Sequence, residues 1–118
     1  MLDTDTTVHT TRHRGTPVVV VTGEVDSTTV EPVREQVFDQ LDRHPRGLVL
    51  DLSGVDFIGS TGLQMLAEAI TRARDLGAVL AVAAEHRAVL LPMRITELDR
   101  EIAVRRTVDQ AVTAVLTR

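Results

Sequence analysis

Glycine and hydroxyl residues gather between positions 54 and 62, in a spacing that first suggests phosphate binding. Gly54 and Gly59 stand five residues apart, and Ser60 and Thr61 follow, as in the phosphate-binding loop of nucleotide hydrolases. That loop needs a lysine directly after its second glycine to neutralise the phosphates. Ser60 stands at that position, and the chain contains no lysine at all. The pattern therefore argues against a nucleotide-hydrolysing site.

Ser60 suggests a second kind of chemistry, as a hydroxyl that accepts a phosphoryl group. It lies where a helix is expected to begin, and free backbone N–H groups with the positive end of the helix dipole favour an anion there. Such a serine can be phosphorylated without refolding the domain, so the phosphate acts on whatever docks over it. Among the serines Ser27, Ser53 and Ser60, only the last combines glycine neighbours with a helix start. The competing interpretation is that Ser60 is only an N-cap, a common role of serine.

Carboxylates and histidines elsewhere form no recognisable catalytic or metal-binding set. His9 and His13 are four residues apart, but their segment has strand or coil character, where that spacing does not create one helical face. Two carboxylate pairs occur near expected strand ends, Glu24 with Asp26 and Asp51 with Asp56. We expect them to serve the loop edge, a helix cap and the strand-end backbone, because no nucleophile and base can be placed around them. The sequence therefore predicts no enzymatic activity, no metal and no cofactor.

The composition limits the classes of partner and compartment. A chain of 118 residues is sufficient for one domain, and 13 basic against 17 acidic side chains give a net charge of −4, which argues against nucleic acid. Without cysteine there is no disulfide framework and no thiolate chemistry. Met1–Asp5 lacks the features of a signal peptide, and the longest apolar run, Ala78–Ala84, is too short to cross a bilayer. We expect a cytoplasmic protein without membrane insertion.

The periodicity of the apolar residues predicts alternating strands and helices. Strands are expected at Val18–Thr22, Leu48–Leu52, Val79–Ala83 and Ile102–Val104, and helices near residues 30–41, 60–76, 86–91 and 108–115. Residues 1–14 are expected to form an N-terminal edge strand or a flexible segment. Such alternation is typical of βα units with right-handed crossovers. The predicted fold class is α/β, a single domain over residues 1–118 with four βα turns, a mostly parallel sheet of four or five strands, and helices packed mainly on one face.

The loops at the carboxyl ends of the first two predicted strands are the expected functional region. They comprise residues 23–26 and 53–59. Within the second loop, Phe57 and Ile58 are expected to anchor the chain in the core. Gly59 and Gly62 are expected to crowd none of their neighbours.

The chain resembles the STAS-domain anti-sigma-factor antagonists of bacteria over roughly residues 17–116. The resemblance rests on three segments in the family's order, namely Gly23-Glu24-Val25-Asp26, Leu50–Ile58 and Ser60-Thr61-Gly62-Leu63. It implies an anti-sigma factor with serine-kinase activity as the partner, phosphorylation at Ser60 with Thr61 as the less favoured acceptor, and a phosphatase that resets the cycle. The unphosphorylated form would bind the anti-sigma factor and so release the sigma factor. The implied partner-binding residues are Gly23, Glu24, Val25, Asp26, Asp56, Gly59, Ser60, Thr61, Gly62 and Leu63.

The sequence departs from the family pattern at the residue before the serine. The family has an aspartate there and this chain has Gly59, which removes an acidic neighbour of the phosphorylated hydroxyl. Glu97 stands where the family commonly has glycine, and Pro92 is expected to shorten the third helix. An alternative follows from the missing aspartate. On that hypothesis the chain is a non-phosphorylated STAS module, acting as a ligand sensor or as an adaptor in a signalling or lipid-transport complex.

Overall fold

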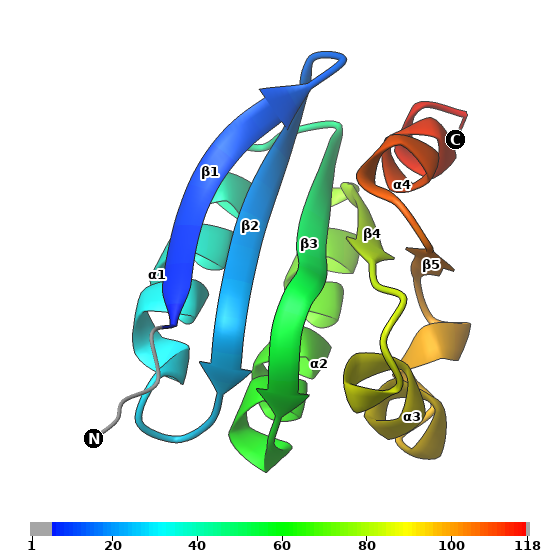
Figure 1. Cartoon of the computed structure of the whole chain (residues 1–118). Coiled ribbons are helices and arrows are strands. Elements are labelled where there is room, and N and C mark those ends of the chain that lie inside the picture. The colour runs from blue at the N-terminus through cyan, green and yellow to red at the C-terminus, as the bar shows by residue number, and fades with distance from the viewer. Residues whose placement is uncertain (1–5, 118) are drawn as a thin grey trace.

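A computed structural model describes residues 6–117 and places one five-stranded sheet among four helices (Figure 1). The strands are β1 (Thr7–His13), β2 (Thr16–Val25), β3 (Gly47–Ile58), β4 (Val79–Ala83) and β5 (Ala103–Arg105). The helices are α1 (Val30–Leu41), α2 (Ser60–Leu76), α3 (Arg87–Ile95) and α4 (Val108–Leu116), with a 3₁₀ turn at Leu98–Arg100. The strand order is β1-β2-β3-β4-β5, with β1 antiparallel to β2 and all other pairs parallel. The predicted fold class is confirmed.

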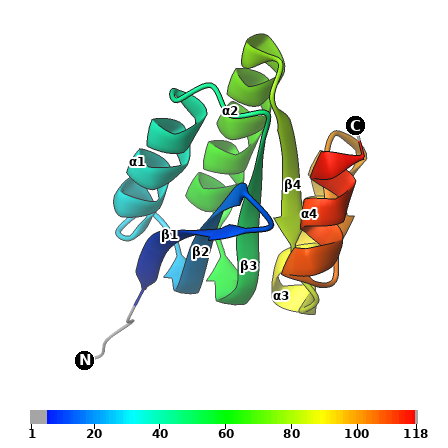
Figure 2. The ribbon, with the colours of Figure 1, turned by 90° about the horizontal axis from the view of Figure 1, so that it is seen from above.

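Both faces of the sheet are covered, but unequally (Figure 2). The valine run of β2 alternates, so that Val19 and Val21 enter the larger core under α1, α2 and α3. Val18 faces the other side and packs in a smaller cluster under α4, which contributes Val112 and Val115. The helices therefore lie mainly on one face, as predicted. None of the helices within residues 6–117 is both long and apolar enough to span a membrane.

The N-terminal segment contributes a regular edge strand. All seven residues of β1 pair with β2 in unbroken register, from Thr7 opposite Thr22 to His13 opposite Thr16. Gln36 of α1 donates a hydrogen bond from its side chain to the carbonyl oxygen of Val8 and thereby occupies one acceptor on the strand's open edge. Residues 1–5, on which the expectation about a signal peptide depends, lie outside the described part of the chain.

The two segments expected to be loops are largely strand. β2 runs to Val25 and β3 to Ile58, because their pairing continues past register shifts between Val20 and Thr22 and between Gly23 and Glu24. Gly54 allows this close approach, since a Cβ there would lie 2.9 Å from Cγ2 of Thr22. The expectation of loops is therefore wrong for residues 23–25 and 53–58, which belong to strands β2 and β3.

The third helix continues through its proline. α3 ends at Ile95 rather than before Pro92, where the sequence predicted its end. A proline inside a helix forfeits one backbone hydrogen bond, a cost that packing can offset. Here Val89 and Met93, on either side of Pro92, are fully buried in the core, and this burial holds the helix together.

Candidate functional site

The ends of β2 and β3 lie directly beside each other and lead into the first turn of α2. Glu24 pairs with Phe57 and Val25 with Ile58 in the parallel ladder. The backbone N–H of Gly59 then donates a hydrogen bond to the carbonyl oxygen of Val25, with 2.9 Å between the two atoms. The segments that carry the predicted partner-binding residues thus lie side by side at the lower end of the sheet (Figure 1), although Val25 and Gly62 themselves are buried.

Ser60 is the first residue of α2 and is exposed. The N-cap of this 17-residue helix is Gly59, in an extended conformation with φ −91° and ψ −174°, and the helix has no side-chain cap hydrogen bond. The interpretation of Ser60 as an N-cap is therefore wrong. Its hydroxyl stands beside the free N–H groups of the first turn, where an added anion is favoured by the helix dipole.

The residues that follow Ser60 seat the helix on the sheet. Thr61 and Leu63 are half-buried, and Gly62 is fully buried. A Cβ at Gly62 would lie 2.7 Å from Cγ1 of Ile58 and 3.0 Å from Cγ1 of Val25. Gly62 crowds no neighbour only because it has no side chain, and this absence is what allows α2 to approach the strand ends this closely.

Phe57 is the feature that sequence reasoning placed wrongly. Ile58 is buried as expected, at 4% exposure, but the Phe57 side chain is 49% exposed. In β3 both Val55 and Ile58 point into the core, so the two residues between them, Asp56 and Phe57, are left facing outwards. An exposed aromatic ring therefore lies against Gly59, within contact distance of a Cβ built there. Strict strand alternation from Val55 would have predicted Phe57 inside and Ile58 outside, so no simple sequence signal reveals this arrangement.

Asp26 organises the turn between β2 and α1. Its Oδ1 accepts hydrogen bonds from the hydroxyl of Thr28 at 2.8 Å and from the backbone N–H of the same residue at 2.9 Å. These bonds hold the pKa of Asp26 below its usual value, with the Thr28 hydroxyl the largest cause. The hydroxyl of Thr29 donates to the carbonyl oxygen of Glu24 at 2.7 Å and closes the turn. Asp26 thus fixes the turn itself, while the N-cap of α1 is Thr29.

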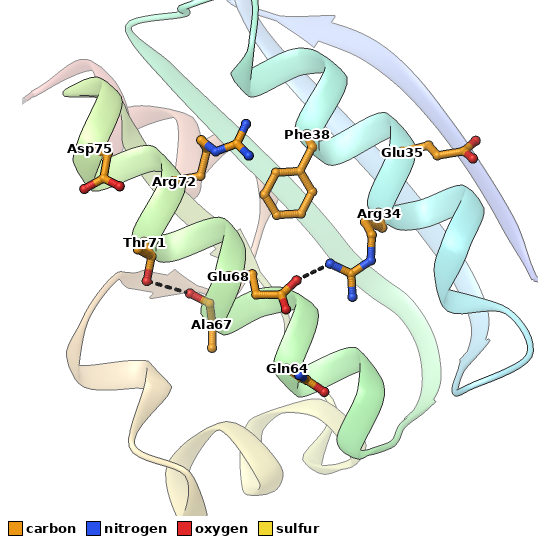
Figure 3. A pocket seen from close by; sticks show the side chains of 9 residues that line it. All are labelled: Arg34, Glu35, Phe38, Gln64, Ala67, Glu68, Thr71, Arg72 and Asp75. Atoms are coloured by element: carbon orange, nitrogen blue, oxygen red, sulfur yellow. Dashed lines mark hydrogen bonds and ion pairs between the residues drawn. The ribbon is translucent and has the colours of Figure 1, made fainter.

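A groove between α1 and α2 runs up from the site (Figure 3). It has a volume of about 750 Å³, and Gln64, one turn beyond Ser60, lies on its wall. The guanidinium carbons of Arg34 and Arg72 lie 6.0 and 5.1 Å from the centre of the Phe38 ring. Arg34 also pairs with Glu68 across the groove, which raises the pKa of Arg34. These contacts link α1 to α2, the helix that begins at Ser60.

With this geometry in place, comparison with known proteins decides the family. The sequence matches the STAS domain family over residues 7–111, which is most of the chain. The chain belongs to the STAS domain family. The Ser60-Thr61-Gly62 segment, for which the sequence resemblance implied phosphorylation, forms the start of α2.

The relatives of this STAS domain are regulatory proteins by name. The anti-sigma-F factor antagonist RsfB of Mycobacterium tuberculosis is 32% identical over 112 residues, covering 92% of this chain and 88% of the relative. The crystal structure of an anti-sigma factor antagonist from Mycobacterium paratuberculosis superposes with a TM-score of 0.88 at 33% identity, covering 95% of each chain. The anti-sigma factor antagonist SpoIIAA, in its unphosphorylated form, shares the fold with a TM-score of 0.77 at 15% identity, covering 95% of this chain and 98% of its own.

The other residues considered for nucleotide binding, acid–base catalysis or metal binding do not form a site in the described part of this STAS domain. The would-be phosphate loop is strand from Gly54 to Ile58 and cannot wrap around a nucleotide. Oδ1 of Asp51 accepts hydrogen bonds from the N–H and hydroxyl of Ser53, so this carboxylate serves the strand backbone, as expected. Within residues 6–117 no three side chains of the metal-ligating types gather together. His13 instead bonds Asp109 of α4 at 2.9 Å.

Proposed function

We propose that this STAS domain is an anti-sigma-factor antagonist switched by phosphorylation of Ser60. In its unphosphorylated form it binds an anti-sigma factor that has serine-kinase activity, and the sigma factor is released. The kinase transfers the γ-phosphoryl group of ATP to Oγ of Ser60, whose proton is lost, and ADP leaves. A serine phosphatase restores the binding form. This cycle takes place in the cytoplasm, where sigma factors act.

The observation that carries the proposal is the position of Ser60. Its hydroxyl is exposed at the first position of α2, a long helix whose dipole favours negative charge at that end. Gly59, directly before Ser60, adds no side chain that would hinder a kinase. A kinase can therefore reach the hydroxyl and leave the fold unchanged, because the new phosphate needs no buried space.

The neighbouring charges explain how the phosphate would end binding. Glu24, Asp26 and Asp56 belong to the same end of the sheet, and the phosphate adds close to two more negative charges at pH 7. A partner that fits the unmodified surface would then have to desolvate the phosphate against its own interface. A loss of about 3 kcal/mol there weakens binding by roughly a hundredfold.

Intact-mass analysis with matched serine variants tests the proposal. The partner to use first is an anti-sigma-F factor with ATP, the class that the 32% identical relative is named for. Wild type should gain one phosphate and then no longer bind the anti-sigma factor. Ser60→Ala should stay unmodified and bind the anti-sigma factor with or without ATP. Ser53→Ala is the control, because Ser53 is also exposed but lies within β3. Ser60→Asp should fold normally and bind weakly, since one carboxylate only partly imitates a phosphate.

A second function is favoured by one observation, the absence of a carboxylate at Gly59. If no phosphate is transferred and Ser60→Asp binds as well as wild type, the switching mechanism is wrong and the adaptor or ligand-sensor hypothesis replaces it. A phosphate mapped to Thr61 would also contradict the proposal. Thr61 is half-buried, so we expect Thr61→Ala to retain the switch.

A further inference from the structure

The end of the sheet opposite Ser60 contains a small pocket formed by two turns and the last helix. The pocket has a volume of about 320 Å³. It lies between the β1–β2 hairpin, the connection from α1 to β3 and the end of α4, which meet at the upper end of the molecule (Figure 1). Its apolar wall consists of Pro17, Pro45, Val115 and Leu116. Leu116 is 41% exposed, so part of this wall is open to a ligand.

The pocket is basic in an acidic protein. Its lining includes Arg12, Arg14 and Arg46 and no acidic residue, although the whole chain carries a net charge of −4. Arg14 is neutralised by Asp109, with 3.1 Å between Nη1 and Oδ1. The eight ion pairs among residues 6–117 include neither Arg12 nor Arg46. Nη1 of Arg12 donates to the carbonyl oxygen of Gly15 at 2.7 Å, so within the described chain both arginines lack a carboxylate partner, and Arg12 has its other N–H groups left for a ligand.

The two turns beside Arg12 and Arg46 contain residues with strained backbone. Arg14 has φ 54° and is followed by Gly15 with φ 81°, a left-handed pair in which the first position normally favours Asn, Asp or Gly. His44, two residues before Arg46, has φ 57°. Only three non-glycine residues between 6 and 117 have positive φ, and two of them lie in the turns of this pocket. Strain of this kind concentrates where geometry is needed for binding.

We propose that this pocket binds a small organic anion. A carboxylate or phosphate group would lie between Arg12 and Arg46, where bidentate charge-assisted hydrogen bonds are available, and a short chain or ring would lie against Val115 and Leu116. Ligand pockets commonly have about 300 to 1,000 Å³, so this one suits a compact molecule. The site is separate from Ser60, and its test does not depend on the proposed switch.

A titration with phenyl phosphate, followed by ¹H–¹⁵N correlation spectra, tests the inference. We expect saturable shifts of the Gly15, Gly47 and Leu116 amides, with a dissociation constant of about 1 mM. Arg46→Gln should weaken binding about tenfold, the effect of losing one charge-assisted hydrogen bond. Arg12→Gln provides a second, independent variant. Arg94→Gln is the matched control, because Arg94 is exposed on α3 at the other end of the molecule and has no ion pair within residues 6–117.

Three further probes separate the parts of the ligand. Benzoate replaces the phosphate by a carboxylate, and whichever of the two binds more tightly identifies the preferred head group. Inorganic phosphate lacks the ring and should bind at least several-fold more weakly, whereas benzyl alcohol lacks the charge and should not bind. The proposal is overturned if neither anion saturates these amides, if inorganic phosphate binds as tightly as phenyl phosphate, or if Arg94→Gln weakens binding as much as Arg46→Gln.

Discussion

The backbone N–H of Gly59 donates to the carbonyl oxygen of Val25 at 2.9 Å, and this bond joins the start of α2 to the end of β2. The ladder between β2 and β3 ends one residue earlier, at the pair of Val25 and Ile58. The helix that carries Ser60 is therefore held by the same backbone hydrogen bonding as the sheet. Changes at Gly59 and Gly62 test how this junction serves stability and phosphorylation.

Gly59→Asp should increase the rate of Ser60 phosphorylation without destabilising the fold. Gly59 has φ −91°, so an aspartate is not strained there, and aspartate is a good N-cap residue. Its Cβ would lie 3.2 Å from Cε2 of Phe57, a half-exposed ring that can shift. We expect the free energy of unfolding to change by less than about 1 kcal/mol. Initial rates with the kinase and denaturant titrations measure the two effects.

Gly59→Ala is the control, because it adds a Cβ without the carboxylate. If Gly59→Asp is phosphorylated at the wild-type rate or more slowly, the missing carboxylate does not limit phosphorylation of Ser60.

Gly62→Ala should destabilise the domain, although alanine favours helices. The new Cβ would meet Cγ1 atoms of two buried β-branched side chains, Ile58 and Val25, at 2.7 and 3.0 Å. Overpacking of this kind costs about 1–3 kcal/mol, more than the roughly 1 kcal/mol gained in helix propensity. Urea unfolding of Gly62→Ala beside Gly59→Ala measures the difference. If the variant is as stable as wild type, the side chains of Ile58 and Val25 can shift to accommodate the new Cβ, and the overpacking argument is wrong.

Phe57→Ser should weaken partner binding more than it weakens the fold. Phe57 is 49% exposed and its ring lies against Gly59, and an exposed aromatic residue next to a docking site is a typical binding hot spot. Loss of about 2 kcal/mol of binding energy would reduce affinity roughly thirtyfold. Leu116→Ser, at the opposite end of the molecule, is the control for loss of an exposed apolar side chain. Titration calorimetry with the anti-sigma factor checks both; similar affinities for wild type and Phe57→Ser would place the ring outside the interface.

Acid should destabilise the turn at Asp26. Its folded-state pKa is lowered from 3.8 by hydrogen bonds from Thr28, so the ionised carboxylate stabilises the fold at pH values above the unfolded-state pKa. This contribution is lost as the pH falls through the folded-state pKa. Unfolding free energies measured between about pH 5 and pH 2 should therefore fall more steeply in wild type than in Asp26→Asn. Parallel curves would show that the carboxylate in this turn is not coupled to folding.

Local patterns predicted the helices best. α2 begins and ends at the predicted residues because its apolar period is clear and Gly77 stops it in the left-handed conformation, with φ 72°. Thr107, a residue type that favours the N-cap, caps α4, and its hydroxyl oxygen accepts the N–H of Gln110 at 3.1 Å. Both signals lie within a few residues of sequence, which is why no knowledge of the tertiary structure was needed.

The site itself depends on contacts between distant residues, and these were predicted less well. The extension of β2 and β3 needs a bulged register between segments about 30 residues apart, which no local pattern encodes. Because of it, Phe57 lies outside, the reverse of what the sequence indicated. The start of α2 at Ser60 did not depend on these contacts and is confirmed, whereas phosphorylation of Ser60 stays a prediction.

The bulged pairing that carries β2 and β3 to their ends also bears on the speed of the proposed switch. A docking surface built on paired strands is already in its binding shape, so association loses little entropy to the ordering of loops. The rate of complex formation would then be set by diffusion and by electrostatic attraction or repulsion, without a preceding conformational change. On the proposed mechanism, a molecule would become competent to bind as soon as its phosphate is removed. The delay between signal and response would therefore arise in the kinase and the phosphatase. Their relative activities would set the fraction of the antagonist that is unphosphorylated and able to bind.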